Sequence, residues 1–388
     1  MKSFRHIVPA LRLHHGADSL AELGRELARA QCSRAVIVCG RSLAGDAVLI
    51  DHIHTAMAGR CAGVYAGVQA HSPLPAVEEA ARSLRAFEAD AVVAVGGGSA
   101  VVTARAANIL LAETGDAHTL CTSRDAGGAL HSPKLLAPKL PQFVLPTTPT
   151  TATLKAGSAV LDPVDGARLA LYDPKTRAQA VFVHPALLAT PAPALVVSAG
   201  LNTLAMACEG LMSLAGDPFS DALLSHAARL LVHGLPALLA GGGDTMAVRA
   251  ELMMASLLCG HGTDYTGAGI AIPLGHAISA RFHVDNGIAN AIVLPHVVRF
   301  NAEAARAGLD QLGMALVGTS GGGAPAVIAA LHSLLQALGT PSRLRDIGVT
   351  QDALPALAAV AMEDWFVRDN PRRVTAKEEL LQVLQRAW

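Results

Sequence analysis

The sequence has little of what a nucleic-acid-binding protein needs. Only 3% of its residues are aromatic, and its 30 lysines and arginines are balanced by 31 aspartates and glutamates. Nucleic-acid binders use basic surfaces to contact phosphates and aromatic rings to stack on bases. The near-neutral charge and the shortage of rings argue against a nucleic-acid partner and favour a small-molecule ligand.

The sequence also lacks the marks of a secreted or membrane protein. Residues 1–6 contain no apolar signal core, and the apolar run Leu230–Ala240 is short and interrupted by Pro236. None of the six cysteines lies in a CxxC pair, which predicts reduced core thiols. They are Cys32, Cys39, Cys61, Cys121, Cys208 and Cys259. We therefore expect a cytoplasmic protein that does not span a membrane.

Apolar residues, in contrast, are abundant enough for two domains. The chain has 388 residues, of which 52% are hydrophobic and 16% charged, and this balance is typical of a folded protein with buried cores. In its first half, apolar runs predicted to be buried parallel strands alternate with helical periodicity. The strands are Ala35–Gly40, Ala91–Val95, Gln142–Pro146 and Val181–Val183, and the helices are Leu20–Ala30, Leu74–Glu88 and Val101–Leu111. This βαβ pattern predicts a doubly wound sheet.

Strand signals mostly stop near residue 185, and Ala/Leu-rich helical segments continue to Trp388. The prediction is an α/β domain over residues 1–184 and an all-α domain over residues 185–388. The glycine clusters at 241–243 and 321–323 are predicted loops between helices.

Two loops that follow predicted strands have the composition of a nucleotide site. The run Gly96, Gly97, Gly98 and Ser99 leads into a predicted helix, so free backbone N–H groups at a helix N-terminus could bind a pyrophosphate. The second loop is rich in hydroxyl groups that can bond phosphate or ribose oxygens. It contains Thr147, Thr148 and Thr151. A tight strand-to-helix turn and a simple Thr/Pro turn are the alternative interpretations.

The combination of motifs resembles the iron-containing alcohol dehydrogenase family over nearly the full length of the chain. The resemblance rests on the GGGS run, on the PTT motif at 146–148, on 198–209, and on the segment from Gly287 to His296. It implies an N-terminal nucleotide-binding domain, a C-terminal helical domain of the dehydroquinate-synthase-like type, and a nicotinamide held between them. The family also suggests a homodimer.

The metal-binding positions of that family hold other residues here. An aspartate and three histidines bind the metal in the family, and ungapped comparison places Asn202, Met206, Ile272 and Asn286 at these positions. None is a good ligand for Fe²⁺ or Zn²⁺. We therefore expect no catalytic metal and assign these four residues to the substrate side of the site. An asparagine at the position of Asn202 is a feature that resembles the maleylacetate reductases of the same family.

Without a metal, another group must supply a proton to the carbonyl oxygen as hydride transfer makes it negative. His276 matches a family histidine near the nicotinamide and is the first candidate, with His283 the second. A structural role for either histidine is the alternative.

The choice of cofactor depends on the end of the first predicted strand. An acidic residue there would bond the 2′-hydroxyl of NAD and repel a 2′-phosphate, but this chain has Gly40, Arg41 and Ser42. Space, a cation and a hydroxyl favour NADP(H), while NAD(H) stays possible. A plain turn with a solvated arginine is the alternative.

Three functional classes follow. The first is a metal-independent NAD(P)H-dependent reductase of a small aldehyde, ketone or oxo acid such as maleylacetate. The second is a metal-dependent alcohol dehydrogenase with an unrecognised site. The third is a catalytically silent nucleotide-binding protein.

Overall fold

The computed structural model describes residues 3–125, 129–164, 166–241 and 245–388. It divides into two compact units. One comprises Val8–Pro191, and the other comprises Ala192–Trp388 together with the N-terminal residues up to Ile7. The division falls after Pro191, later than the position after residue 184 expected from the sequence. The short helix α7 (Pro185–Leu188) stays with the first unit, because Leu187 packs into the core on one face of its sheet.

The first unit is built on a six-stranded sheet in the order β1-β10-β7-β4-β2-β3, with every pairing parallel. The strands are β1 (Arg12–His15), β2 (Ala35–Gly40), β3 (Cys61–Val68), β4 (Ala91–Gly96), β7 (Gln142–Pro146) and β10 (Ala178–Val183). The chain moves outward from β2 to β3 and then returns to place β4 on the other side of β2. This reversal is the switch point at which doubly wound sheets bind ligands.

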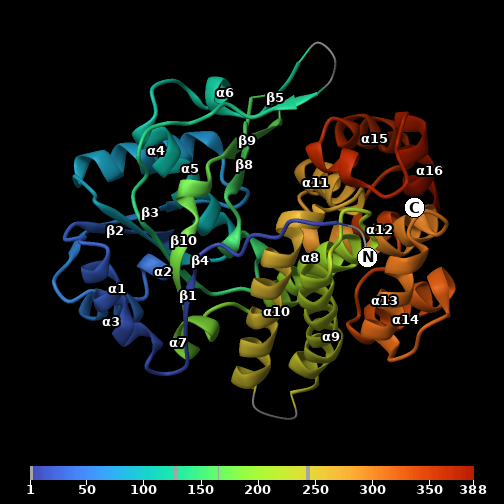
Figure 1. The fold of residues 1–388 in the computed structure, drawn as a ribbon, viewed down its shortest axis with the longest axis horizontal. Coiled ribbons are helices and arrows are strands. Elements are labelled where there is room, and N and C mark those ends of the chain that lie inside the picture. The colour runs from blue at the N-terminus through green and yellow to red at the C-terminus, as the bar shows by residue number, and fades with distance from the viewer. Residues whose placement is uncertain (1–2, 126–128, 165, 242–244) are drawn as a thin grey trace. The chain divides into compact units, whose positions relative to one another are not determined.

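Helices cover both faces of this sheet (Figure 1), as expected for a parallel sheet buried on both sides. On one face, η1 (Ser19–Glu22), α1 (Leu23–Arg29) and α3 (Ala47–Ala56) pack on alternate residues of the strands, including Ile37, Val93 and Phe143. The other face is covered by α4 (Leu74–Ala86) and α5 (Gly98–Ala112). The predicted doubly wound sheet is therefore confirmed.

Several elements of the first unit differ from their predicted form. The predicted helix Leu20–Ala30 begins as the 3₁₀ turn η1, and Asp18 makes no side-chain cap there. The strands β1 and β3 were not predicted, and neither was the antiparallel hairpin of β8 (Gly157–Leu161) and β9 (Arg168–Tyr172). The remaining short elements are α2 (Arg41–Ala44), α6 (Ala117–Leu120), β5 (Ser123–Arg124), β6 (Leu130–His131), η2 (Thr151–Leu154) and η3 (Pro174–Thr176).

The second unit is helical, and one apolar cluster forms its core. Its α-helices are α8 (Pro193–Met212), α9 (Pro218–Ala240), α10 (Thr245–Thr266), α11 (Ala271–Phe282), α12 (Asn286–Asn301), α13 (Arg306–Val317), α14 (Gly323–Ala337), α15 (Leu354–Met362) and α16 (Lys377–Ala387). The described residues of this unit also form the short 3₁₀ turns η4 (Leu344–Ile347), η5 (Gln351–Ala353) and η6 (Trp365–Asp369). Gly321 and Gly322 precede α14, as predicted, whereas Gly242 and Gly243 lie outside the described residues.

Two helices, α8 and α9, are long and apolar enough to cross a membrane by length and composition alone. The apolar window of α8 is 83% buried inside the unit, and that of α9 is 39% buried. Core helices of soluble proteins pass the same test, so the observation is weak evidence for a membrane span.

The N-terminal segment packs on the helical unit. The ring of His6 stacks on Tyr265 with centroids 4.1 Å apart, and its Nδ1 lies 3.0 Å from Oδ2 of Asp217. The backbone N–H of Ile7 donates to the Tyr265 hydroxyl at 2.6 Å. Tyr265 therefore has a structural role that the sequence did not reveal.

Candidate active site

In the α/β unit, the predicted cofactor loops follow three adjacent strands. β2 ends at Gly40, β4 at Gly96 and β7 at Pro146, and these strands are neighbours in the sheet. Because carboxyl ends of parallel strands meet at one edge, the loops that follow them come together there. Gly40 is extended and precedes α2, where Arg41 and Ser42 are exposed.

The glycine loop and the threonine loop are in direct contact. A Cβ placed on Gly97 would lie 2.8 Å from Oγ1 of Thr148, and one on Gly98 would lie 3.0 Å from Oγ1 of Thr150. Gly96 has φ of +140°, which a residue with a side chain rarely adopts. Glycine at these positions is therefore needed both for the turn and for the close approach of the threonine hydroxyls.

Neighbouring side chains hold the two loops in place. Thr147 and Thr148 are buried, and the N–H of Thr147 donates to the carbonyl of Gly96 at 3.0 Å. Oγ of Ser99 accepts the N–H of His71 at 3.2 Å. The fully buried Arg105 of α5 donates to the carbonyls of Ala152 and Gly157, at 2.5 and 2.7 Å. This arginine connects the helix behind the glycine loop to η2, which begins at Thr151.

In the helical unit, three helices bring together the residues predicted on the substrate side. Asn202 and Met206 are four residues apart on α8, so they share one face of the helix. Ile272 and His276 are related in the same way on α11, and Asn286 begins α12. These three helices pack on one another.

A buried asparagine links these helices. Asn290 of α12 is fully buried, and its Nδ2 donates to Oδ1 of Asn202 at 2.7 Å. Its own Oδ1 lies where a side chain at Gly275 of α11 would be, 1.6 Å from an ideal Cβ. Sequence analysis did not assign a role to Asn290, because an asparagine inside a helical run gives no local signal of a contact with two other helices.

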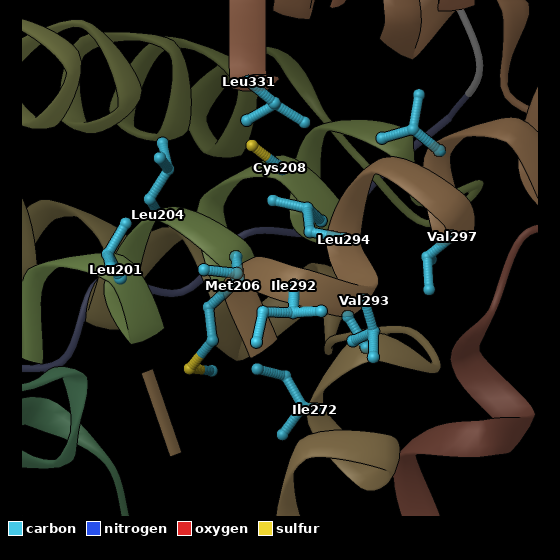
Figure 2. Packing of buried hydrophobic residues seen from close by; sticks show 14 of the residues in the cluster. Leu201, Leu204, Met206, Cys208, Ile272, Ile292, Val293, Leu294, Val297 and Leu331 are labelled. Carbon is cyan, nitrogen blue, oxygen red and sulfur yellow. The ribbon is translucent and has the colours of Figure 1, made fainter. Parts of the chain in front are cut away.

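Met206 and Ile272 are apolar neighbours. They are 7% and 2% exposed and belong to the hydrophobic core of the unit. Figure 2 shows both side chains among those of this cluster, together with Ile292 of α12. Oδ1 atoms of Asn286 and Asn290 are buried without a hydrogen-bond partner in the described part of the chain.

His276 lies one helical turn after Ile272 and pairs with a carboxylate. Its Nδ1 is 3.2 Å from Oδ2 of Asp364, which precedes η6, and the two side chains are 17% and 9% exposed. The sequence alone does not reveal the role of Asp364, because this residue is far from His276 in the chain. His283, the second candidate, is the exposed C-cap residue of α11 with φ of +55°.

A second carboxylate fixes the start of α11. Oε1 of Glu209 on α8 accepts the N–H of Ala271 at 2.6 Å, and the side chain is fully buried. Burial raises the pKa of Glu209 to about 7, against the lowering effect of its backbone N–H partners, and the nearby Asp364 raises it further. Glu209 thereby couples the helix that carries Ile272 and His276 to α8.

Comparison with known proteins places the chain in a family. A model of iron-containing alcohol dehydrogenases matches residues 10–185, and the model of the C-terminal part of the same family matches residues 196–388. Maleylacetate reductase 2 of Cupriavidus pinatubonensis (strain JMP 134) is 30% identical, over 97% of this chain and 94% of its own length. Lactaldehyde reductase of Escherichia coli (strain K12) is 28% identical, over 96% of this chain and 97% of its own.

The fold agrees with this assignment. The structure of sulfoacetaldehyde reductase from Bifidobacterium kashiwanohense, solved with NAD⁺, superposes with a TM-score of 0.85 at 20% identity, and covers 100% of this chain and 99% of its own. Together with the two family models, these likenesses confirm the resemblance found in the sequence. The chain belongs to the iron-containing alcohol dehydrogenase family and is an NAD(P)-dependent oxidoreductase that acts on alcohol and carbonyl groups.

Proposed function

We propose that this protein reduces a small aldehyde, ketone or oxo acid with NADPH, without a bound metal, and that His276 donates the proton. The observation that carries the proposal is the ion pair of His276 with Asp364, because His276 shares one face of α11 with Ile272. An acid–base group thus lies beside the position where the family resemblance places a metal ligand.

The cofactor part of the proposal rests on the α/β unit. The loops after β2, β4 and β7 flank the switch point of the sheet, and the glycine and threonine loops touch. We assign Gly40, Arg41, Ser42, Gly96–Ser99, Thr147, Thr148 and Thr151 to the cofactor. When bound, the reduced nicotinamide supplies the hydride. The exposed Arg41 favours NADPH, because a guanidinium attracts a 2′-phosphate.

The residues present at the four aligned positions do not fit a metal. Oδ1 of Asn202 accepts a hydrogen bond from Asn290, and Met206 and Ile272 belong to an apolar core. No group of three or more His, Cys, Asp or Glu side chains with metal-binding geometry occurs within residues 3–125, 129–164, 166–241 and 245–388. A neutral amide, a thioether and an alkyl group are poor ligands for Fe²⁺. We therefore derive no catalytic step through a metal.

The mechanism then depends on this chain's own side chains. We assign Asn202, Met206, Ile272 and Asn286 to contacts with the substrate. An imidazolium at His276 would donate its proton as charge develops on the carbonyl oxygen, which is a task for a general acid. The apolar surfaces of Met206 and Ile272 exclude water, which strengthens that interaction.

One screen tests the function. Purified protein is assayed for oxidation of NADPH and NADH against aldehydes, ketones and oxo acids, maleylacetate included, and its metal content is measured by elemental analysis. Turnover by protein without stoichiometric metal supports the proposal. One metal per chain with activity lost to EDTA would overturn it in favour of a metal-dependent dehydrogenase. Nucleotide binding without turnover would instead favour a catalytically silent binding protein.

The family resemblance also carries a proposal about assembly and location. We propose a homodimer that works in the cytoplasm. Light scattering on the purified protein tests the dimer, and fractionation of cells tests the location.

A further inference from the structure

Asp364 is held between the backbone and the imidazole of His276. Its Oδ1 accepts the N–H of Phe366 at 3.0 Å, which caps η6, and its Oδ2 faces Nδ1 of His276 at 3.2 Å. The side chain is 9% exposed, so water competes little for either oxygen. The carboxylate therefore has a fixed position that does not depend on the histidine.

This contact decides which ring nitrogen of His276 transfers a proton. An ionised carboxylate only accepts hydrogen bonds, so Nδ1 must carry its proton in every state of the ring. The neutral ring then has its lone pair on Nε2, and the charged ring carries its exchangeable proton there. The carboxylate also offsets the positive charge of the imidazolium and prevents the ring from rotating.

We propose that Asp364 is a positioning residue that fixes His276 for proton donation from Nε2. The inference rests on the proposed function, because it acts through the proposed donor. In the step, a hydride leaves the reduced nicotinamide for the carbonyl carbon, and the Nε2 proton of His276 goes to the carbonyl oxygen. The products would be the alcohol, the oxidised nicotinamide and a neutral imidazole, in which Nδ1 keeps its proton and still donates it to Asp364. A proton from the solvent then returns to Nε2.

Further titratable and charged residues belong to the elements that carry the pair. Glu209 of α8 interacts electrostatically with Asp364 and is fully buried. Glu363 precedes Asp364 in the chain, and Arg281 lies further along α11.

The substitution Asp364→Asn tests the inference. An asparagine oxygen can still cap η6, but its N–H₂ group would donate to Nδ1 and so favour the wrong tautomer. We expect kcat to fall about 10- to 100-fold, the usual effect of removing such an orienting partner, with NADPH affinity unchanged. The decline of kcat with rising pH should also begin at a lower pH, because the imidazolium has lost its counter-charge. A capping residue with a purely structural role would not shift the pH profile.

The chain offers a matched control. Asp217 is also an N-cap aspartate whose Oδ2 lies 3.0 Å from Nδ1 of a histidine, His6. Asp217→Asn removes the same chemistry away from the site, so it should lower the melting temperature without changing kcat or its pH profile. An equal loss of kcat in both variants would show that the effect is structural and would overturn the inference.

A double variant separates this inference from the proposed function. If Asp364 acts through His276, His276→Ala/Asp364→Asn should be no slower than His276→Ala alone, and an additive loss would overturn the inference. Wild-type kcat in His276→Ala would overturn the proposed donor itself. A slow His276→Ala with a wild-type-like Asp364→Asn would rule out only the positioning role of Asp364.

¹⁵N NMR of the wild-type His276 ring tests the tautomer without any substitution. A neutral ring protonated at Nε2 would contradict the inference.

Discussion

The two units of this protein differ in whether the backbone or the side chains perform their proposed task. The nucleotide loops of the α/β unit depend on backbone: Gly96 has a positive φ, and Gly97 and Gly98 leave space for threonine hydroxyls. The site in the helical unit depends on side chains, and four positions that the family resemblance assigns to metal ligands hold Asn202, Met206, Ile272 and Asn286. The proposed cofactor site therefore depends on backbone geometry, and the proposed substrate site depends on the chemistry of its side chains.

In the helical unit, side-chain and backbone contacts connect the helices of the proposed site. Asn290 connects α8 and α12, and Glu209 connects α8 and the start of α11. A Cβ on Gly287 would lie 1.7 Å from the carbonyl of Ser198, so α12 and α8 are in contact at the backbone. These interactions hold the helices together by hydrogen bonding and packing.

The largest effect is expected from placing metal ligands at the four positions of the helical unit. The combined variant Asn202→Asp, Met206→His, Ile272→His and Asn286→His should bind Zn²⁺ or Fe²⁺ at about one ion per chain, because a carboxylate and imidazoles form strong bonds to these ions. Elemental analysis after dialysis measures this gain. A variant with glutamine at the three histidine positions is the control and should stay metal-free. A folded variant that binds no ion would show that the four positions do not converge.

The next largest effect is expected at His276. His276→Ala should lower kcat by about 10² to 10⁴, the range for loss of a general acid, and leave NADPH affinity nearly unchanged. Steady-state kinetics, NADPH titration and melting temperature on the same protein separate this from a packing role, in which binding and stability fall together. His283→Ala, at the exposed end of α11, is the control. If that variant is the slow one, the donor is His283.

Glu209 gives a prediction on stability. Its pKa is raised from 4.5 to about 7. The unfolded chain therefore loses this proton at lower pH than the folded one, and the free energy of unfolding falls as pH rises through this window. Glu209→Gln should remove that fall, which amounts to roughly 3 kcal/mol. Urea unfolding at pH 5 and pH 8 measures it, and equal slopes in the two proteins would contradict the raised pKa. Burial lowers the pKa of His296 to about 4, but its contribution to the pH dependence is the same in both proteins and cancels when they are compared.

The smallest effect is expected at Arg41 in the proposed cofactor site of the α/β unit. Arg41→Asp should weaken NADPH far more than NADH, because it places a like charge beside the 2′-phosphate. A charge-assisted contact contributes about 1.5 to 3 kcal/mol, or roughly one to two decades of affinity. Fluorescence titration with both nucleotides measures the ratio of the NADPH and NADH affinities. Ser42→Ala should change this ratio less. Equal changes for both nucleotides would place Arg41 outside the site.

The sequence predicted the parts of the fold that have strong local signals. β2 and β7 have the predicted bounds, because a continuous apolar run that ends in glycine or proline identifies a buried strand. β1 was missed because it is a four-residue edge strand containing Arg12, His14 and His15. β3 was missed because four of its eight residues are alanine or glycine, which interrupt the run of residues typical of strands.

The candidate site was predictable only in part. The family resemblance identified the positions on α8, α11 and α12, because it is carried by short continuous segments. Asp364 and Asn290 could not be found in this way, since their importance lies in contacts with helices far away in the sequence. The contacts of His14 are equally hidden in the sequence: its ring stacks on Phe182, and its Nε2 lies 3.3 Å from Oε1 of Glu26.

The packing of the N-terminal segment makes the helical unit discontinuous in sequence. His6 stacks on Tyr265 and Phe219, and the chain then enters the α/β unit at Val8 and returns at Ala192. A fragment that starts at residue 192 would therefore lack the ring that stacks on Tyr265 and Phe219, and Asp217 would lack its imidazole partner. Such a fragment should be rescued by a separate peptide that contains the first residues of the chain. If it is, binding of a short peptide would report on the folding of the helical half.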